Sequence, residues 1–218
     1  HRDQETQRKQ TTSAEYVRHL LVWSEDSKNT YIAAGIDEKK LSVVGIPHLD
    51  SLFIMLQNKD SWEKLRIGIR ESSGFGTVKP LVVFAPPILS RYEGDPTRAI
   101  TEMVGWATTN SINIAVCLHP LEPRENLDRV RTAIENHSVA KVFMGSITLD
   151  LIAASDLVVT QHSSIGLESL ALNIRTAILD LDNIGILESL ADQGVALQVN
   201  KNNLSDLGNF LNGLTVDM

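Results

Sequence analysis

The residues best suited to chemistry lie in a short polar turn, Gln161, His162, Ser163 and Ser164. A β-branched run precedes the turn, and apolar residues at helical spacing follow it over residues 165–172. Adjacent serines there would present hydroxyls beside unpaired N–H groups at a helix N-terminus, whose dipole adds partial positive charge. The turn therefore predicts a phosphate site, and simple helix capping by Ser163 or Ser164 is the alternative.

Glu168 adds to this pattern. It lies four residues after Ser164 and five after Ser163, whereas a capping-box glutamate lies three residues after its serine. We therefore expect Glu168 to contact a ligand, such as sugar hydroxyls beside the phosphate, with a solvated helical glutamate as the alternative.

A second candidate is His119, which directly follows the apolar run 112–118. Pro120 prevents that strand from continuing. An imidazole at this point could donate a hydrogen bond to a phosphate oxygen or to a leaving group. A histidine that is merely polar at a strand end is the alternative.

Guanidinium groups match phosphate oxygens, so the arginines near these positions are candidates for diphosphate contact. Arg91 and Arg124 lie in loops that we expect at the ligand edge, whereas Arg98 does not. His162 is a weaker candidate for the same cleft. No spacing of carboxylates and histidines is typical of a metal site, and we expect no cofactor.

Strands and helices must alternate to position these residues. Expected strands cover 20–23, 41–44, 81–84, 112–118, 140–144, 157–160, 176–181 and 195–199. Expected helices cover 24–34, 49–56, 61–69, 96–109, 124–134, 146–154, 165–172, 182–193 and 204–211. This alternation predicts an α/β fold with a doubly wound parallel sheet.

Ligands in such sheets bind beyond the carboxyl ends of the strands. That rule selects the loops 85–92, 119–124 and 161–164 as the ligand edge. The first loop contains Pro86, which we include among the expected contacts. The glycine-bearing segment 71–79 precedes a strand and so lacks the strand-to-helix arrangement of a phosphate loop.

The 218 residues, 43% of them hydrophobic, are enough for one good core, so we expect a single globular domain. The net charge of -7 argues against a nucleic-acid partner. The one cysteine, Cys117, lies in an apolar run and should be a buried structural thiol in a reducing compartment. Without a 20-residue apolar run or a signal-peptide pattern, we expect a cytoplasmic protein.

Residues 157–173 resemble the donor-binding half of GT-B-fold proteins, namely bacterial capsule and polyol-phosphate polymer transferases and, more distantly, UDP-GlcNAc 2-epimerases. In those families a Ser-Ser…Gly-Leu-Glu turn and helix holds the nucleotide. The resemblance implies that Ser163 and Ser164 meet phosphate and that Glu168 accepts from ribose hydroxyls. The pair His119 and Pro120 is similar to the companion motif of capsule transferases and several sialyltransferases.

The segment Gly45-Ile-Pro-His-Leu-Asp50 is similar to the crossing between the two domains of these families. The resemblance covers roughly residues 20–190 and implies a Rossmann-like donor nucleotide-binding domain over 20–218. Residues 1–19 would be a polar linker or the end of a missing N-terminal acceptor domain. The chain begins at His1 rather than Met, so we expect further sequence upstream.

The resemblance implies a glycosyltransferase-type domain for a UDP-, CDP- or CMP-linked sugar or polyol phosphate in surface polysaccharide synthesis, with His119 as its catalytic residue. Two alternatives stay open: a nucleotide-sugar 2-epimerase and a non-catalytic nucleotide-binding module. Epimerases carry a histidine and an acidic pair where this chain has Ala85, Pro86 and Pro87, which favours a transferase. Peripheral membrane association through the full-length protein and the oligomeric state also stay open.

Overall fold

The computed structural model describes residues 17–89, 97–161, 163–180, 194–200 and 202–213. Contacts divide the chain into two compact units, His1–Ser51 and Leu52–Met218. The boundary between them lies inside the range that the sequence analysis treats as one domain.

The small unit is a βαβ element. Strands β1 (Leu20–Val22) and β2 (Leu41–Val43) pair in parallel, with helix α2 (Glu25–Ala33) and the 3-10 turn η1 (Glu38–Lys40) between them. Ser24 caps α2, since its side chain accepts a hydrogen bond from the Ser27 N–H at 3.1 Å. The predicted helix from Ser24 to the stop at Gly35 is therefore confirmed, and Gly35 has the positive φ of 93° that favours glycine.

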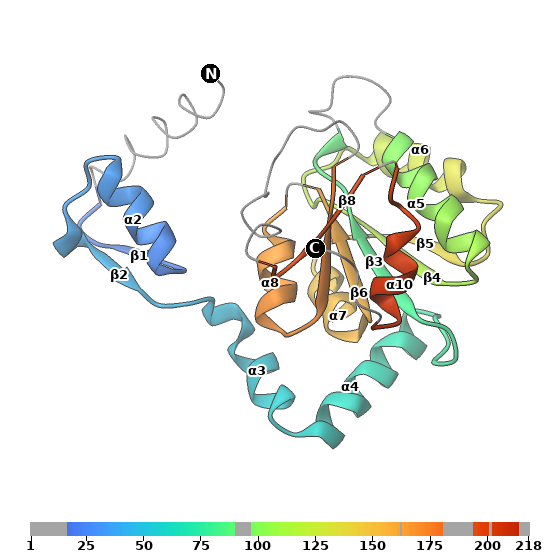
Figure 1. Ribbon diagram of the computed structural model, residues 1–218, viewed down its shortest axis with the longest axis horizontal. Coiled ribbons are helices and arrows are strands. Elements are labelled where there is room, and N and C mark those ends of the chain that lie inside the picture. Colours follow the sequence, from blue (N-terminus) through green and yellow to red (C-terminus); the bar gives the residue numbers. More distant parts are fainter. Residues whose placement is uncertain (1–16, 90–96, 162, 181–193, 201, 214–218) are drawn as a thin grey trace. The chain divides into compact units, whose positions relative to one another are not determined.

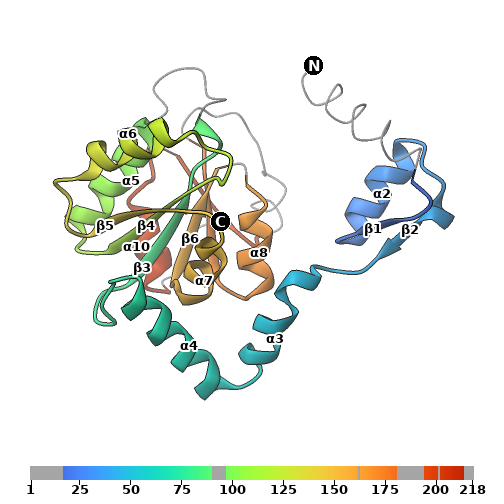
Figure 2. The same ribbon diagram turned by 180° about the vertical axis from the view of Figure 1, so that it is seen from behind.

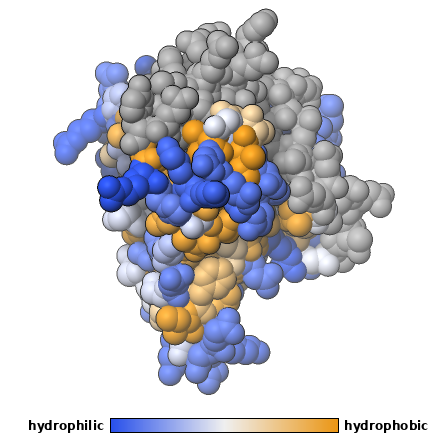
Figure 3. Space-filling model, turned by 90° about the vertical axis from the view of Figure 1, so that its left-hand side faces the viewer, coloured by the Kyte–Doolittle hydropathy of each residue, from blue (hydrophilic) through white to orange (hydrophobic). Residues whose placement is uncertain are grey.

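Val22, Ile36 and Leu41 form the core of the small unit. Its other apolar side chains include Leu21 and Val43, which are 61% and 38% exposed. Parallel strands are normally covered on both faces, so this strand pair exposes more apolar surface than is usual. Figure 3 draws one side of the molecule, where hydrophobic residues in orange lie exposed among hydrophilic ones in blue.

The large unit contains a six-stranded sheet in which every strand pair is parallel. The order across the sheet is β5-β4-β3-β6-β7-β8 (Figure 1). In chain order the strands are β3 (Leu81–Ala85), β4 (Asn113–Leu118), β5 (Ala140–Met144), β6 (Leu157–Thr160), β7 (Arg175–Leu179) and β8 (Leu197–Val199). This Rossmann-like layout confirms the predicted doubly wound parallel sheet.

Helices cover both faces of this sheet (Figures 1 and 2). One face packs against α5 (Arg98–Thr109), α6 (Arg124–Ile134) and α10 (Asp206–Leu211), and the other against α7 (Ile147–Ala154) and α8 (Ile165–Ala171). Helix α4 (Lys59–Ser72) packs on α7, and it follows η2 (Pro47–Leu49) and α3 (Asp50–Leu56) along the chain. Because both faces are covered, the strands consist of nearly continuous apolar residues, and β3 is buried along its whole length.

Several predicted helix starts need correction or lie outside the described residues. The helix predicted to begin at residue 61 begins earlier, at Lys59, and Asn58 caps it by accepting from the Ser61 N–H at 2.9 Å. Ser146 stands at the N-cap of α7, but its side chain makes no capping bond. The predicted start of the helix 96–109, at residue 96, and the predicted helix 182–193 fall outside the described residues. In the part of the chain that the structure describes, no helix is both long and apolar enough to cross a membrane.

Candidate functional site

The strand order creates a switch point at β3. From β3 the chain moves outward on one side through β4 and β5, and then returns to place β6 on the other side of β3. At the carboxyl end of this pair, Ala85 lies opposite Thr160, and the Thr160 hydroxyl donates to the Ala85 carbonyl at 3.1 Å. Parallel α/β sheets bind ligands in the crevice outside such a point.

The three loops predicted as the ligand edge all leave the sheet here. They follow β3, β4 and β6, which are neighbours in the sheet. His119 and Ser163 each lie three residues beyond a residue that pairs with β3, namely Val116 and Thr160. Neighbouring strands are about 4.8 Å apart, so β4 and β6 end roughly 10 Å from each other. The histidine loop and the serine turn therefore flank the end of β3.

The loop after β4 holds His119 in one orientation. The His119 Nδ1 atom accepts a hydrogen bond from the Leu121 N–H at 3.1 Å, and the Glu122 N–H donates to the His119 carbonyl at 2.9 Å. Since Nδ1 is the acceptor, the neutral ring carries its proton on Nε2. His119 is half-buried, and its Nε2–H is the ring donor that a ligand at this edge can use.

Glu122 connects two of these loops, and no sequence pattern predicts this role. It is 6% exposed. One carboxylate oxygen accepts from the Leu89 N–H in the loop after β3, and the other accepts from the Asn126 side chain in α6 at 2.7 Å. The local sequence does not indicate that Glu122 is buried, because its partner Leu89 is 33 residues away along the chain.

The serine turn leads directly into α8. Ser164 occupies the N-cap position, yet its side chain makes no capping bond and is exposed. The half-buried Ser163 accepts from the Ile165 N–H through its hydroxyl at 3.3 Å, which is a long bond. Ser164 therefore does not cap α8 through its side chain, whereas the long Ser163 bond is a contact of the capping type and leaves that alternative open for Ser163. The turn presents hydroxyl groups at the start of α8, but the first N–H groups of the helix are not unpaired as expected. That of Ile165 donates to the Ser163 hydroxyl, and those of Gly166 and Leu167 donate to the Ser163 and Ser164 carbonyls.

Gly166 lets α8 approach the sheet closely. A Cβ at this position would lie 3.2 Å from Cγ2 of Thr160 in β6 and 4.0 Å from Cγ2 of Thr176 in β7. Behind it, the buried Ser169 hydroxyl lies 2.8 Å from the Thr176 hydroxyl. The glycine and this hydroxyl pair hold the first turn of α8 against the strand end that carries the serines. Glu168 lies half-buried in that first turn.

The remaining predicted contacts are distributed along the same edge. Pro86 is buried directly after β3, Pro120 is exposed beside His119, and Arg124 is exposed at the first residue of α6. Arg91 and His162 lie outside the described residues. Over the described ranges, no group of three or more histidine, cysteine or acidic side chains could hold a metal ion.

Cys117 is 2% exposed in β4. Burial raises the pKa of its thiol to about 12, and a hydrogen bond with the Thr148 side chain opposes this only in part. A thiol that stays protonated at neutral pH is not a nucleophile, which agrees with the predicted structural role.

No family model matches the sequence, and no curated protein matches it. Solved structures do share its fold. The wall teichoic acid polymerase TagF aligns at a TM-score of 0.59 with 15% identity, over 84% of this chain and 42% of that chain. The UDP-GlcNAc 2-epimerase of Methanocaldococcus jannaschii, in complex with UDP-GlcNAc and UDP, aligns at 0.62 with 19% identity, over 89% and 54%.

The UDP-GlcNAc 2-epimerase of Neisseria meningitidis, bound to UDP-GlcNAc, aligns at 0.57 with 12% identity, over 89% of this chain and 53% of that chain. The chain thus spans about half of the length of these proteins, from 42% to 54%. At such identities the likeness is one of fold. This chain carries a GT-B-like, Rossmann-type α/β domain that is similar in fold to parts of the wall teichoic acid polymerase TagF and of UDP-GlcNAc 2-epimerases.

Proposed function

We propose that this domain binds the nucleotide-activated donor of a GT-B-type glycosyltransferase, with a UDP-, CDP- or CMP-linked sugar or polyol phosphate as the donor. The observation that carries the proposal is the position of the serine turn and the histidine loop on either side of the β3 end. These are the two motifs whose resemblance to transferases is independent of the fold comparison.

The proposed chemistry is stabilisation of the leaving phosphate. Ser163 and Ser164 donate their hydroxyls, and the first N–H groups of α8 point the positive end of the helix dipole toward the anion. His119 donates through Nε2, the atom that the Leu121 bond leaves protonated. Preorganised donors of this kind stabilise charge that develops during transfer. Arg124, at the start of α6, adds a guanidinium group at the same edge.

Glu168 has a separate role in the proposal. Its carboxylate accepts hydrogen bonds from ribose hydroxyls beside the phosphate, as its place one turn into α8 allows. The acceptor substrate and the catalytic base belong to a domain outside residues 20–218. Transfer to a surface polysaccharide is the reaction that this arrangement would serve.

A nucleotide-sugar 2-epimerase is the second candidate function. The epimerase of M. jannaschii, whose structure contains UDP-GlcNAc and UDP, matches this fold at a TM-score of 0.62. Pro86 and Pro87 follow β3 where the resemblance to epimerases would require a histidine and acidic residues, which favours the transferase. Incubation of the full-length protein with UDP-GlcNAc alone separates the two, since an epimerase forms the 2-epimer without any acceptor.

The binding test is isothermal titration calorimetry with UDP, CDP and CMP against the chain and its Ser163→Ala/Ser164→Ala variant. Hydrogen bonds to a charged phosphate contribute about 1.5–3 kcal/mol each, so we expect at least a roughly tenfold loss of affinity. Ser205→Ala is the matched control, because Ser205 is also an exposed N-cap serine without a capping bond. Equal affinity in the double variant and the control would refute the phosphate role.

The ribose contact has its own test. Glu168→Gln should weaken binding of ribonucleotides by about 1.5–3 kcal/mol and that of 2′-deoxyribonucleotides much less, because a charge-assisted bond to one hydroxyl is lost. A loss of the same size for both sugars would mean that Glu168 does not contact the 2′-hydroxyl.

A further inference from the structure

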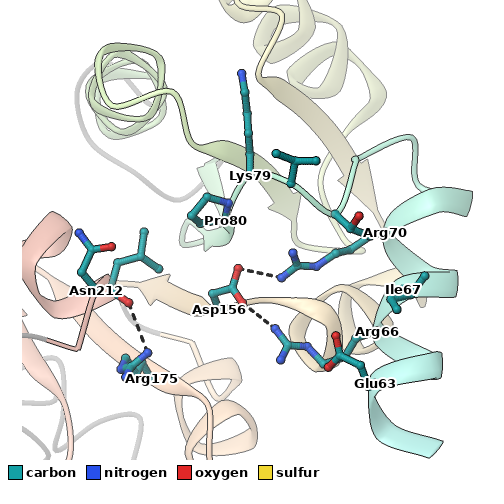
Figure 4. Close-up of a pocket in the computed structure, with 12 residues that line it drawn as sticks. Glu63, Arg66, Ile67, Arg70, Lys79, Pro80, Asp156, Arg175 and Asn212 are labelled. Carbon is teal, nitrogen blue, oxygen red and sulfur yellow. Dashed lines mark hydrogen bonds and ion pairs between the residues drawn. The ribbon is translucent and has the colours of Figure 1, made fainter. Parts of the chain in front are cut away.

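A cavity of about 600 Å³ opens at the opposite edge of the sheet from the proposed donor site. It lies at the amino ends of the strands, beside Pro80, which precedes β3, and Asp156, which precedes β6. Helix α4 forms one wall, and the start of β7 with the end of α10 forms another. Figure 4 shows Arg66 and Arg70 reaching Asp156 from α4, with Arg175 on the other side of Asp156.

Asp156 gives the two α4 arginines a structural role. Its carboxylate accepts from Arg66 at 2.6 Å, from Arg70 at 2.7 Å and from the Leu81 N–H at 2.8 Å. Burial is the largest influence on this carboxyl and acts to raise its pKa. The Leu81 bond and the charges of Arg70 and Arg66 outweigh burial, so the pKa is lowered and the group stays ionised. These contacts anchor α4 to the sheet edge.

The lining of the cavity has more positive charge than this structural role requires. Its charged members are four cationic and two acidic side chains: Arg66, Arg70, Lys79, Arg175, Glu63 and Asp156. The whole chain has a net charge of -7, so the cavity is cationic on an otherwise acidic protein. Asp156 forms ion pairs with only two of these four cations, Arg66 and Arg70.

Arg175 differs from Arg66 and Arg70 because it does not pair with Asp156. It is exposed, and one of its Nη groups donates to the Leu211 carbonyl at 3.3 Å. Its other Nη group packs against Gly213, where a Cβ would lie only 2.9 Å from it. Arg175 forms no ion pair with any carboxylate of the described residues. Among the residues that the structure describes, its guanidinium group is therefore held beside the cavity by backbone contacts and not by a carboxylate.

The α4 wall also keeps donors available. A guanidinium group has five N–H donors, and Arg66 and Arg70 bind Asp156 through their Nη2 atoms. Within the described part of the chain, no hydrogen bond uses the Nη1 atom of either arginine. The Arg66 Nε atom is buried without a partner among the same residues. Lys79 lies exposed at the rim and extends away from Asp156 in Figure 4.

We propose that this cavity binds a small phosphate-class anion with two adjacent charged groups, of the chemistry of diphosphate. Guanidinium forks match phosphate oxygens in geometry and charge. Donors on two facing walls, Arg66 and Arg70 on α4 and Arg175 on β7, fit a ligand that presents oxygens in two directions. The cavity lies at the other end of the strands from the serine turn, so this site is independent of the proposed donor function.

The test uses inorganic pyrophosphate as the probe, titrated into the full chain by calorimetry at low ionic strength. We expect Arg175→Ala to weaken pyrophosphate binding about tenfold or more, since a charge-assisted bond contributes about 1.5–3 kcal/mol. Lys64→Ala is the matched control, because Lys64 is an exposed cation on α4 that does not line the cavity. It should change the affinity less than about twofold, because an exposed charge outside the site contributes little.

Two further arms locate the site. Because the serine turn is itself proposed to bind phosphate, the titration is repeated in the Ser163→Ala/Ser164→Ala background, where Arg175→Ala should still weaken pyrophosphate binding about tenfold or more. In the same background, inorganic phosphate should bind at least about tenfold more weakly than pyrophosphate, since it reaches one wall only. Melting temperatures of all variants check that each is folded. Unchanged pyrophosphate affinity on adding Arg175→Ala to the serine background, or equal affinity of that background for phosphate and pyrophosphate, would overturn the proposal.

Discussion

Replacing Asp156 by asparagine tests whether one carboxylate holds α4 against the amino ends of the sheet strands. The carboxylate accepts three hydrogen bonds, from Arg66, Arg70 and the Leu81 N–H. Asparagine has the same shape but has only one oxygen. Its NH₂ group would face a donor at the position of the second oxygen, so at least one arginine loses its hydrogen bond and both lose their anionic partner.

The expected magnitude follows from partial burial. Exposed ion pairs contribute about 0.2–1 kcal/mol, and breaking a fully buried pair costs about 3–5 kcal/mol. The Asp156 side chain is 29% exposed, and those of Arg66 and Arg70 are 24% and 9% exposed. The energy of this network should lie between these limits, and the remaining amide oxygen still accepts at least one bond. We expect Asp156→Asn to lower the free energy of unfolding by about 2–4 kcal/mol.

The assay is urea unfolding at pH 7 followed by circular dichroism, with Asp128→Asn as the control. Asp128 pairs with Arg131 on α6 at 3.7 Å, and its side chain is 75% exposed. The control should therefore lose less than about 1 kcal/mol. Equal shifts in the two variants would refute the reasoning, because they would show that the Asp156 contacts contribute no more than a solvated pair.

The same network predicts a pH dependence. The folded pKa of Asp156 is lowered from its ordinary value of 3.8. A lowered pKa contributes stability above the unfolded value, and this contribution is lost as the pH falls through the folded pKa. The stability difference between wild type and Asp156→Asn should be full at pH 7 and shrink below about pH 4. A difference that stays constant down to about pH 2.5 would contradict an ionised Asp156.

Three other experiments test the carboxyl ends of the strands, where Glu122 and Gly166 lie, and the core, where Cys117 lies. Glu122→Ala should destabilise the protein by about 2–4 kcal/mol and weaken nucleotide binding, because the Leu89 N–H and the Asn126 side chain lose their buried acceptor. Glu122→Gln should restore most of both in urea titration and calorimetry, because its oxygen still accepts from the Leu89 N–H and the Asn126 amide can turn to accept from its NH₂ group; failure to do so would point to a need for the charge itself. Gly166→Ala should weaken nucleotide binding clearly and lower the melting temperature only slightly, because its Cβ would lie 3.2 Å from Thr160 and displace the start of α8. Unchanged nucleotide affinity would contradict a role for this close approach. Cys117 should not react with a thiol reagent at pH 8 until the protein is unfolded, because it is buried and its pKa is raised to about 12, and rapid labelling of the native protein would contradict this.

The sequence by itself determined the elements and their order. The apolar runs at Leu81–Ala85, Ala140–Met144 and Leu157–Thr160 appear as strands, and Arg124–Ile134 appears as the predicted helix. These features depend on periodicity and on residues a few positions apart, which local sequence contains. The same rules also located the polar loops after β3, β4 and β6, because the chain must become polar where a buried strand ends.

Tertiary structure alone decided which distant residues meet. The position of β6 beside β3 brings the serine turn and the histidine loop to the same edge, and this follows from packing across the whole sheet. Glu122 with Leu89, and Asp156 with Arg66 and Arg70, are contacts between residues 33 to 90 positions apart. A charged residue has the same local pattern whether it is solvated or buried with a partner. Only the folded chain supplies the partner and the burial that give such a residue its role.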